Sequence, residues 1–129
     1  MSAILSALAP VTASEWIEAK AFLERFTGVS HDALHVIAGV AVQLILAALF
    51  RSSIARFWPW AVVLLAELAN EWNDLRIERW PSLGEQLGEG AKDIALTMLL
   101  PTLLLITARW WPGLLTRRSV PVEPPPPAG

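Results

Sequence analysis

Three long apolar stretches constrain this chain more than any other feature. They cover residues 31–50, 58–75 and 91–111. A helix needs about 20 residues, at about 1.5 Å each, to cross the roughly 30 Å hydrocarbon core of a membrane. The first and third stretches meet that length, and the second meets it if its acidic end lies at a membrane interface. The sequence therefore predicts an all-α membrane protein whose residues 31–111 form a domain of three transmembrane helices.

The composition agrees with a membrane protein. Of the 129 residues, 54% are hydrophobic and 17% are charged, whereas soluble proteins average about 25% charged residues. Most of the seven tryptophans lie near the ends of the apolar stretches, as expected of rings that favour the membrane interface. The absence of cysteine excludes disulfides and thiolate metal sites. A net charge of −2 with scattered basic residues gives no case for nucleic acid, so the lipid bilayer is the expected partner.

Residues 1–30 form a separate N-terminal segment. From Ser14 to Thr27, apolar and charged residues recur at helical spacing. Thr12 and Glu15 have the spacing of a capping box, and Gly28 suits the position after the last helical residue. The pattern predicts an amphipathic helix in the membrane interface, with packing on the other helices as the alternative. The first ten residues lack the basic start of a signal peptide, so we expect no cleavage there.

The segments between and after the stretches carry turn and breaker residues. Trp80 to Gly84 predicts a loop that continues through Gly88 and Gly90 to the third helix. Pro101 lies in the middle of that helix and predicts a kink. Residues 112–129 end in a proline-rich run that cannot build a core, so the sequence predicts a disordered tail there.

The basic residues do not distinguish the two orientations. With three spans, the two sides of the membrane carry equal numbers of Lys and Arg, Arg117 and Arg118 included. We expect a bacterial inner (cytoplasmic) membrane protein with its N-terminus outside and its C-terminus in the cytoplasm.

The second stretch carries polar residues that are unusual for a membrane span. Glu67, Asn70, Glu71 and Asp74 stand at i, i+3, i+4 and i+7, so a helix places them on one face. An acid near the middle of a span costs about 2.5 kcal/mol or more on insertion scales, against roughly −0.5 for each Leu or Val. This face is therefore expected to meet protein partners or water.

Partners for that face occur on the other two helices. In an up-down-up arrangement, the start of the first helix, the end of the second and the start of the third share one half of the membrane. The polar residues of all three segments then converge. They form the candidate site: His31, Asp32, His35, Glu67, Asn70, Glu71, Asp74, Lys92, Asp93 and Thr97.

Several functions are open to this cluster. Two histidines four residues apart, with carboxylates from the next helix, suit a divalent metal such as zinc. The candidate ligands are His31, His35, Glu67 and Glu71. A metal-bound water could then hydrolyse a lipid or another envelope substrate. The same groups could instead handle protons or ions, or form a network that only holds the helices together.

The third possibility describes a scaffold or a subunit of a larger membrane complex. Small residues such as Gly39 and Ala66 allow helices to approach closely. A homo-oligomer or a larger complex is therefore a further expectation.

The order of these motifs resembles the VanZ-like family of small bacterial membrane proteins. That family has Asp-Lys-x-x-His opening one helix, Glu-x-x-Gln near the end of the next, an Arg-containing loop, and Asp-x-x-x-Asn opening another. Across roughly residues 30–105, the matching stretches are His31-Asp32-x-x-His35, Glu67-x-x-Asn70, a loop with Arg79 and Ser82, and Asp93-x-x-x-Thr97. Each helical motif carries a substitution: His31, Asp32, Asn70 and Thr97 replace the family's residues.

The resemblance implies a polar cluster on the outer face of the membrane and a role in the cell envelope. The family is linked to glycopeptide-antibiotic resistance. The function expected first is therefore a VanZ-like envelope protein that binds a lipid or cell-wall component. A metal-dependent membrane hydrolase and a structural scaffold are the alternatives.

Overall fold

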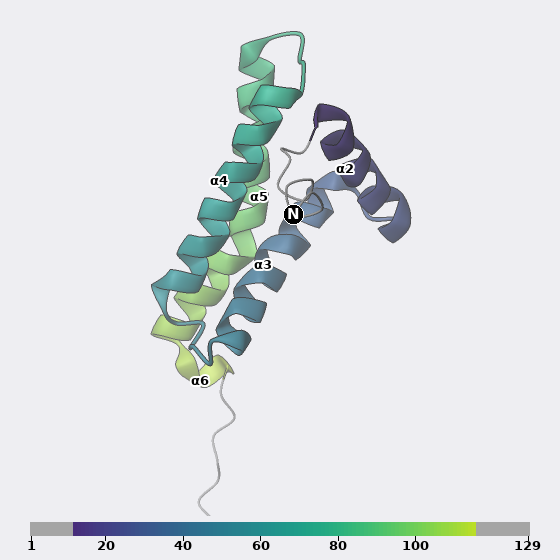
Figure 1. Ribbon diagram of the computed structural model, residues 1–129. Helices are drawn as coiled ribbons and strands as arrows, with labels where there is room; N and C mark the ends of the chain where they lie inside the picture. The colour runs from purple at the N-terminus through teal and green to yellow at the C-terminus, as the bar shows by residue number, and fades with distance from the viewer. Residues whose placement is uncertain (1–11, 116–129) are drawn as a thin grey trace, which may run out of the picture.

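The computed structural model describes residues 12–115, and every regular element in that range is a helix (Figure 1). The helices are α2 (Ala13–Thr27), α3 (His31–Leu49), α4 (Phe57–Ile77), α5 (Leu83–Trp110) and α6 (Pro112–Leu115). Helices α3, α4 and α5 pack on one another, and α6 lies at the end where α5 finishes. The predicted all-α class is confirmed for the described residues.

Two of these helices are long and apolar enough to cross a membrane, α3 and α5. In each of them, only 22% of an apolar stretch of 18 residues is buried, whereas the core helix of a soluble protein is mostly buried. Helix α4 has a similar length of 21 residues but carries acids at positions 67, 71 and 74, which keep it below the same level of hydropathy. The structure thus has two candidate spans, and the third stays a prediction.

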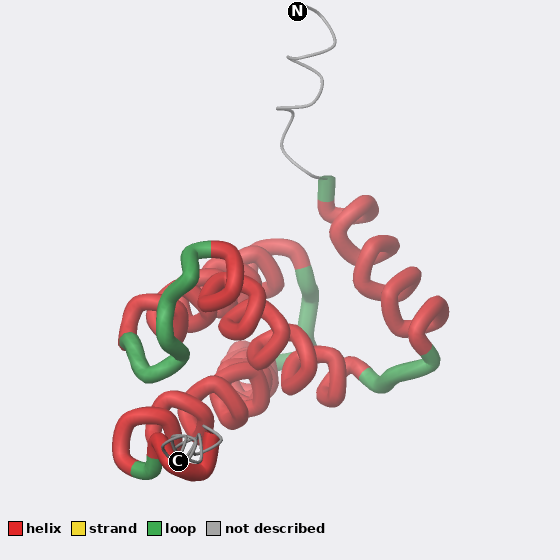
Figure 2. Tube along the Cα trace, turned by 90° about the horizontal axis from the view of Figure 1, so that it is seen from below, coloured by secondary structure: helices red, strands yellow, loops and turns green. Residues whose placement is uncertain are grey.

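Helix α2 has the ends that the sequence predicts. The Thr12 hydroxyl accepts a hydrogen bond from the Glu15 backbone N–H at 3.3 Å, and the Thr12 backbone N–H donates to Glu15 Oε2 at 2.8 Å. These bonds form the predicted capping box and hold the pKa of Glu15 below its ordinary value. Gly28 ends the helix in the left-handed conformation, at φ 66°. Figure 2 shows α2 set to one side of the other helices.

Helix α5 starts earlier than the sequence predicts. We expected a loop through Gly88 and Gly90, but the helix begins at Leu83 and contains both glycines. Ser82 caps this helix, since its hydroxyl accepts from the Glu85 N–H at 3.2 Å. A glycine costs a helix only about 1 kcal/mol relative to alanine, and Gln86 links this segment to α4 by donating to the Asp74 backbone oxygen at 3.3 Å. The helix also continues through Pro101, which is buried.

Buried and exposed positions are reversed relative to a soluble protein. The buried hydrophobic residues among those described are Ala47, Val63 and Met98. The buried polar residues are more numerous: His35, Gln43, Glu67, Glu71, Asp74, Asp93 and Thr97. Large apolar side chains instead lie exposed along the helices, among them Ile37, Leu44, Ile45, Leu65, Leu99 and Leu103.

A close approach of α3 and α5 sets the position of these buried groups. A Cβ added at Gly39 would lie 2.0 Å from the backbone oxygen of Thr97. The two backbones can approach this closely only because residue 39 has no side chain.

Two sequence predictions fall outside the described residues. These are the absence of a cleaved signal in residues 1–10 and the disordered tail from residue 116 onward, with Arg117 and Arg118. The first four residues assigned to the tail, Pro112–Leu115, form α6.

Candidate functional site

Buried polar side chains from three helices meet at the end of the bundle away from α6. Helix α3 supplies two histidines one turn apart, α5 supplies Asp93 and Thr97 one turn apart, and α4 supplies three acids. All are buried except His31, which is partly exposed. We call this set the polar cluster: His31, His35, Glu67, Glu71, Asp74, Asp93 and Thr97.

His35 is the centre of the polar cluster. Its Nδ1 lies 2.9 Å from Thr97 Oγ1 and 3.0 Å from Glu67 Oε1. Its Nε2 lies 3.2 Å from His31 Nε2 and 3.6 Å from Asp93 Oδ2. One imidazole therefore links all three long helices.

His31 connects the polar cluster to α2. Its Nε2 lies 3.3 Å from Asp93 Oδ2, and its Nδ1 lies 3.2 Å from Glu24 Oε1. The ring also packs edge-on against His35, with centroids 4.7 Å apart. Both nitrogens of His31 thus face carboxylates, one from α5 and one from α2.

Asp74 makes the second connection to α2. Trp16 Nε1 donates to Asp74 Oδ1 at 2.7 Å, and Lys20 Nζ donates to Asp74 Oδ2. Trp16, Lys20 and Glu24 are not among the site residues predicted from the sequence. Their spacing of four residues, which puts them on one face of a helix, is the signal that could have identified them.

Three residues of the predicted site lie at the edge of the polar cluster. Lys92 Nζ lies 3.0 Å from Asp32 Oδ1 and also binds Glu89, and all three side chains are at least one-third exposed. Asn70 is half-buried and donates to Glu71 Oε1 at 3.2 Å. These residues lie next to the buried groups rather than among them.

Some buried polar atoms have no hydrogen-bond partner among the described residues. They are Glu67 Oε1, Asp93 Oδ1 and both amide atoms of Gln43. Glu67 Oε1 lies 3.0 Å from His35 Nδ1, but His35 makes its hydrogen bond with Thr97. A buried polar atom left unpaired costs roughly 1–3 kcal/mol. The unpaired oxygens of Glu67 and Asp93 can each accept a further partner.

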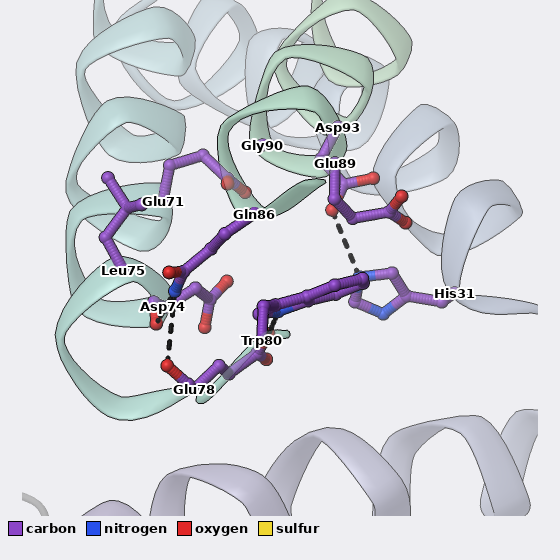
Figure 3. Close-up of a pocket in the computed structure, with 10 residues that line it drawn as sticks. All are labelled: His31, Glu71, Asp74, Leu75, Glu78, Trp80, Gln86, Glu89, Gly90 and Asp93. Carbon is purple, nitrogen blue, oxygen red and sulfur yellow. Dashed lines mark hydrogen bonds and ion pairs between the residues drawn. The ribbon is translucent and has the colours of Figure 1, made fainter. Parts of the chain in front are cut away.

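Two cavities border the polar cluster. The first is an acidic pocket of about 220 Å³, shown in Figure 3, where His31 and Asp93 lie opposite Glu71 and Asp74. Glu78, Glu89, Trp80 and Gln86 also line it. The second is an apolar groove of about 570 Å³ between α2, α3 and α4. His31 lines both cavities.

The carboxylates and histidines include groups with the spacing of metal ligands. His35, Glu67 and Glu71 have ligand atoms within 4.8 Å of one another, as do His31, His35 and Asp93. The sequence predicts one ligand set of His31, His35, Glu67 and Glu71. The structure divides them, because His31 groups with Asp93 instead of with the acids of α4.

No family model matches this chain, and neither a curated protein nor a solved structure matches it. The resemblance to the VanZ-like family therefore stays a prediction. The polar cluster and its two cavities are the features from which a function can be inferred.

Proposed function

We propose that this protein is a small integral membrane protein in which α3, α4 and α5 all cross the bilayer. The reversed burial supports this proposal: large apolar side chains face outward, while the acids of α4 face the other two helices. Contiguous exposed apolar surface of this kind marks a membrane or partner surface. An acidic helix can cross a membrane when its acids are turned toward protein.

The proposed setting is the bacterial inner membrane, with the N-terminus outside and the C-terminus in the cytoplasm. This orientation puts the polar cluster in the outer half of the membrane, where the VanZ-like resemblance implies it. A periplasmic reporter fused after Gly129 should be inactive and a cytoplasmic reporter active. The opposite result would reverse the orientation.

Within this setting, we propose that the protein binds an amphipathic lipid or a lipid-linked envelope component. The observation that carries this proposal is the apolar groove, which ends at the polar cluster. Leu34, Ile37 and Val42 line its apolar part, and His31 and His35 line its polar end. From residue 31 to residue 42, α3 rises about 16 Å, close to half of the roughly 30 Å hydrocarbon core. The groove therefore matches a lipid chain of one leaflet with its head group beside the histidines.

Helix α2 forms the outer wall of this groove. Its polar residues contact the bundle through Asp74 and His31, while Trp16, Ala19 and Leu23 line the groove. Leu23 is 48% exposed and Ile37 is 51% exposed, so a bound chain would cover apolar surface on both walls. Burying that surface stabilises the complex by about 25 cal/mol per Å² of apolar area removed from water.

The experiment is photolabelling with a phospholipid that carries a diazirine on its acyl chain. Purified protein in nanodiscs is labelled, digested and mapped by mass spectrometry. Labelling should concentrate on the peptide that contains Leu34, Ile37 and Val42. Ala38→Trp, which fills the groove, should reduce labelling of its α2 wall several-fold.

Ile45→Trp is the matched control, because it adds the same ring to an exposed position of α3 outside the groove. It should leave labelling of the α2 wall unchanged. Uniform labelling around the bundle, unaffected by Ala38→Trp, would reject the lipid site.

A further inference from the structure

We propose that His31, His35 and Asp93 form a divalent-metal site, for which zinc is the best-fitting ion, and that Glu24 and Glu67 orient the two histidines. This site goes beyond lipid binding and stands on its own geometry. Its three donor atoms are His31 Nε2, His35 Nε2 and Asp93 Oδ2.

The three donor atoms form a triangle of the right size. The two Nε2 atoms are 3.2 Å apart, and they lie 3.3 and 3.6 Å from Asp93 Oδ2. A tetrahedral zinc ion holds nitrogen and oxygen ligands at about 2.0–2.1 Å, which separates the ligand atoms by about 3.3 Å. The triangle thus has the dimensions of one face of a zinc tetrahedron.

The other nitrogen of each histidine has a carboxylate beside it. His31 Nδ1 lies 3.2 Å from Glu24 Oε1, and His35 Nδ1 lies 3.0 Å from Glu67 Oε1 and 2.9 Å from Thr97 Oγ1, with which it forms its hydrogen bond. Histidine ligands of metals commonly donate the N–H of the second nitrogen to a carboxylate or another acceptor, which fixes the tautomer and the ring orientation. Here this contact would leave both Nε2 lone pairs free to bind the same ion.

The carboxylate that supplies the proposed ligand atom Oδ2 also has a second oxygen that is buried and unpaired. Asp93 is 3% exposed, and its Oδ1 has no hydrogen-bond partner among the described residues. A buried carboxylate needs a compensating charge or donor. A divalent cation on Asp93 supplies that charge.

The alternative ligand sets fit less well. In the set of His35, Glu67 and Glu71, the carboxylate of Glu67 faces Nδ1, the nitrogen away from His31 and Asp93. In the set of Asp32, Glu89 and Asp93, Lys92 already pairs with the first two carboxylates. Of the three sets, only His31, His35 and Asp93 combine two features. Their donor atoms have the spacing of zinc ligands, and the second nitrogen of each histidine has a carboxylate beside it.

The two cavities give the site an entry path and an open position. The acidic pocket carries Glu71, Asp74 and Glu89 and ends at His31 and Asp93 (Figure 3), so it can draw a cation in from water. Three protein ligands leave a fourth position for water or for a ligand oxygen. Because His31 also lines the apolar groove, a lipid head group there would lie beside the ion.

The test is metal binding by the full chain, purified in detergent through a tag without histidine. Loading with Zn²⁺ followed by desalting should leave about one ion per chain by elemental analysis, and Co²⁺ should give the visible absorption of a tetrahedral site. His31→Ala, His35→Ala and Asp93→Asn should each lose stoichiometric binding. Glu24→Gln should weaken the affinity about 10- to 100-fold, as measured against a chromophoric chelator.

Two carboxylates serve as matched controls. Asp32→Asn removes an exposed acid next to His31, and Glu18→Gln removes an exposed acid on the same helix as Glu24. Both should bind zinc like the unchanged chain. Helicity and gel filtration confirm folding of each variant, and the half-exposed Glu24 keeps the proposal testable if a buried variant fails to fold. No stoichiometric metal in the unchanged chain, or equal affinity in Glu24→Gln, would overturn the site while leaving the lipid labelling experiment unaffected.

Discussion

Helix α3 turns one stripe of residues toward the neighbouring helices, and the polarity of this stripe changes along the helix. The stripe consists of residues 31, 35, 39, 43 and 47. The stripe begins with His31 and His35, passes Gly39 and Gln43, and ends at Ala47. Helix α4 changes in the opposite order along the chain, since it buries Pro59 and Val63 near its start but Glu67, Glu71 and Asp74 farther on. Helix α5 changes in the same order as α3, from Asp93 and Thr97 to Met98 and Pro101. The same three helices therefore enclose a polar half and an apolar half.

The two halves are also held together differently. In the polar half, side chains about 60 positions apart in sequence contact one another, as His35 and Thr97 do. In the apolar half, small buried residues pack together, and the hydrogen bonds come from tryptophans, with Trp58 donating to Ser52 and Trp60 to Thr102. The polar half is therefore joined mainly by contacts between charged and polar side chains of different helices, whereas among the described residues no charged side chain makes such a contact in the apolar half.

The largest effect is expected at Gly39, where the two halves meet. Gly39→Ala puts a Cβ within 2.0 Å of the Thr97 backbone oxygen, so α3 and α5 must separate. We expect a loss of about 2–3 kcal/mol in the free energy of unfolding in mixed micelles, together with loss of zinc binding.

The same substitution at Gly88 is the control. Apart from the adjoining residues and backbone of its own helix, no atom of residues 12–115 lies within 4 Å of a Cβ added there, so the exposed helix should gain up to about 1 kcal/mol. Equal effects of the two substitutions would show that the close approach of α3 and α5 at Gly39 does not stabilise the bundle.

The next effect concerns the two lysines of the polar half. Lys20 pairs with Asp74, and their side chains are 23% and 11% exposed. Lys20→Met leaves Asp74 without its cation, and we expect a loss of about 2 kcal/mol, between the values for exposed and buried pairs. Hydrogen exchange of the amides in α2 should become faster, because α2 loses a main contact with the bundle.

Lys92→Met is the matched change in an exposed pair. Its partners Asp32 and Glu89 are more than one-third exposed, so the cost should stay below about 1 kcal/mol. An equal loss in both variants would contradict the division between buried and exposed charges.

A smaller effect, of opposite sign, is expected at Gln43. Its side chain is fully buried and has no hydrogen-bond partner among the described residues. Gln43→Leu removes two unpaired polar atoms and should raise stability by about 1 kcal/mol. Gln86→Leu should lower it, since Gln86 donates to the backbone oxygens of Asp74 and Glu78. Destabilisation by Gln43→Leu would show that the Gln43 amide makes a stabilising interaction and belongs to the polar half.

Much of this arrangement follows from the sequence. Capping residues mark α2 to within one residue of its observed start, and the up-down-up order predicts that polar groups of three helices converge. The sequence does not fix how far each helix is rotated about its axis. That rotation puts Asp93, rather than Glu67 or Glu71, beside the Nε2 atoms of both histidines.

Long-range docking was also beyond the sequence. The four-residue spacing puts Trp16 and Lys20 on one face of α2, but nothing local indicates that this face meets Asp74, more than 50 positions away. The early start of α5 was missed because three glycines outweighed one capping serine in the local pattern. Tertiary contacts with α4, such as those of Gln86, reverse that balance.

The smallest effect separates the capping of α2 from its docking. Hydrogen bonds from Thr12 lower the pKa of Glu15 from its ordinary value of 4.5. These bonds therefore contribute fully to stability above pH 4.5, and this contribution is lost as the pH falls through the lowered pKa. Thr12→Ala removes only the hydroxyl, while the backbone N–H still donates. The pKa of Glu15 should therefore rise part of the way to its ordinary value in a carbon-13 NMR titration, whereas Ser14→Ala should leave it lowered. Zinc binding should not change in either variant, because α2 is held to the polar half by Trp16, Lys20 and Glu24. A loss of zinc binding in Thr12→Ala would show that the cap also positions these three residues.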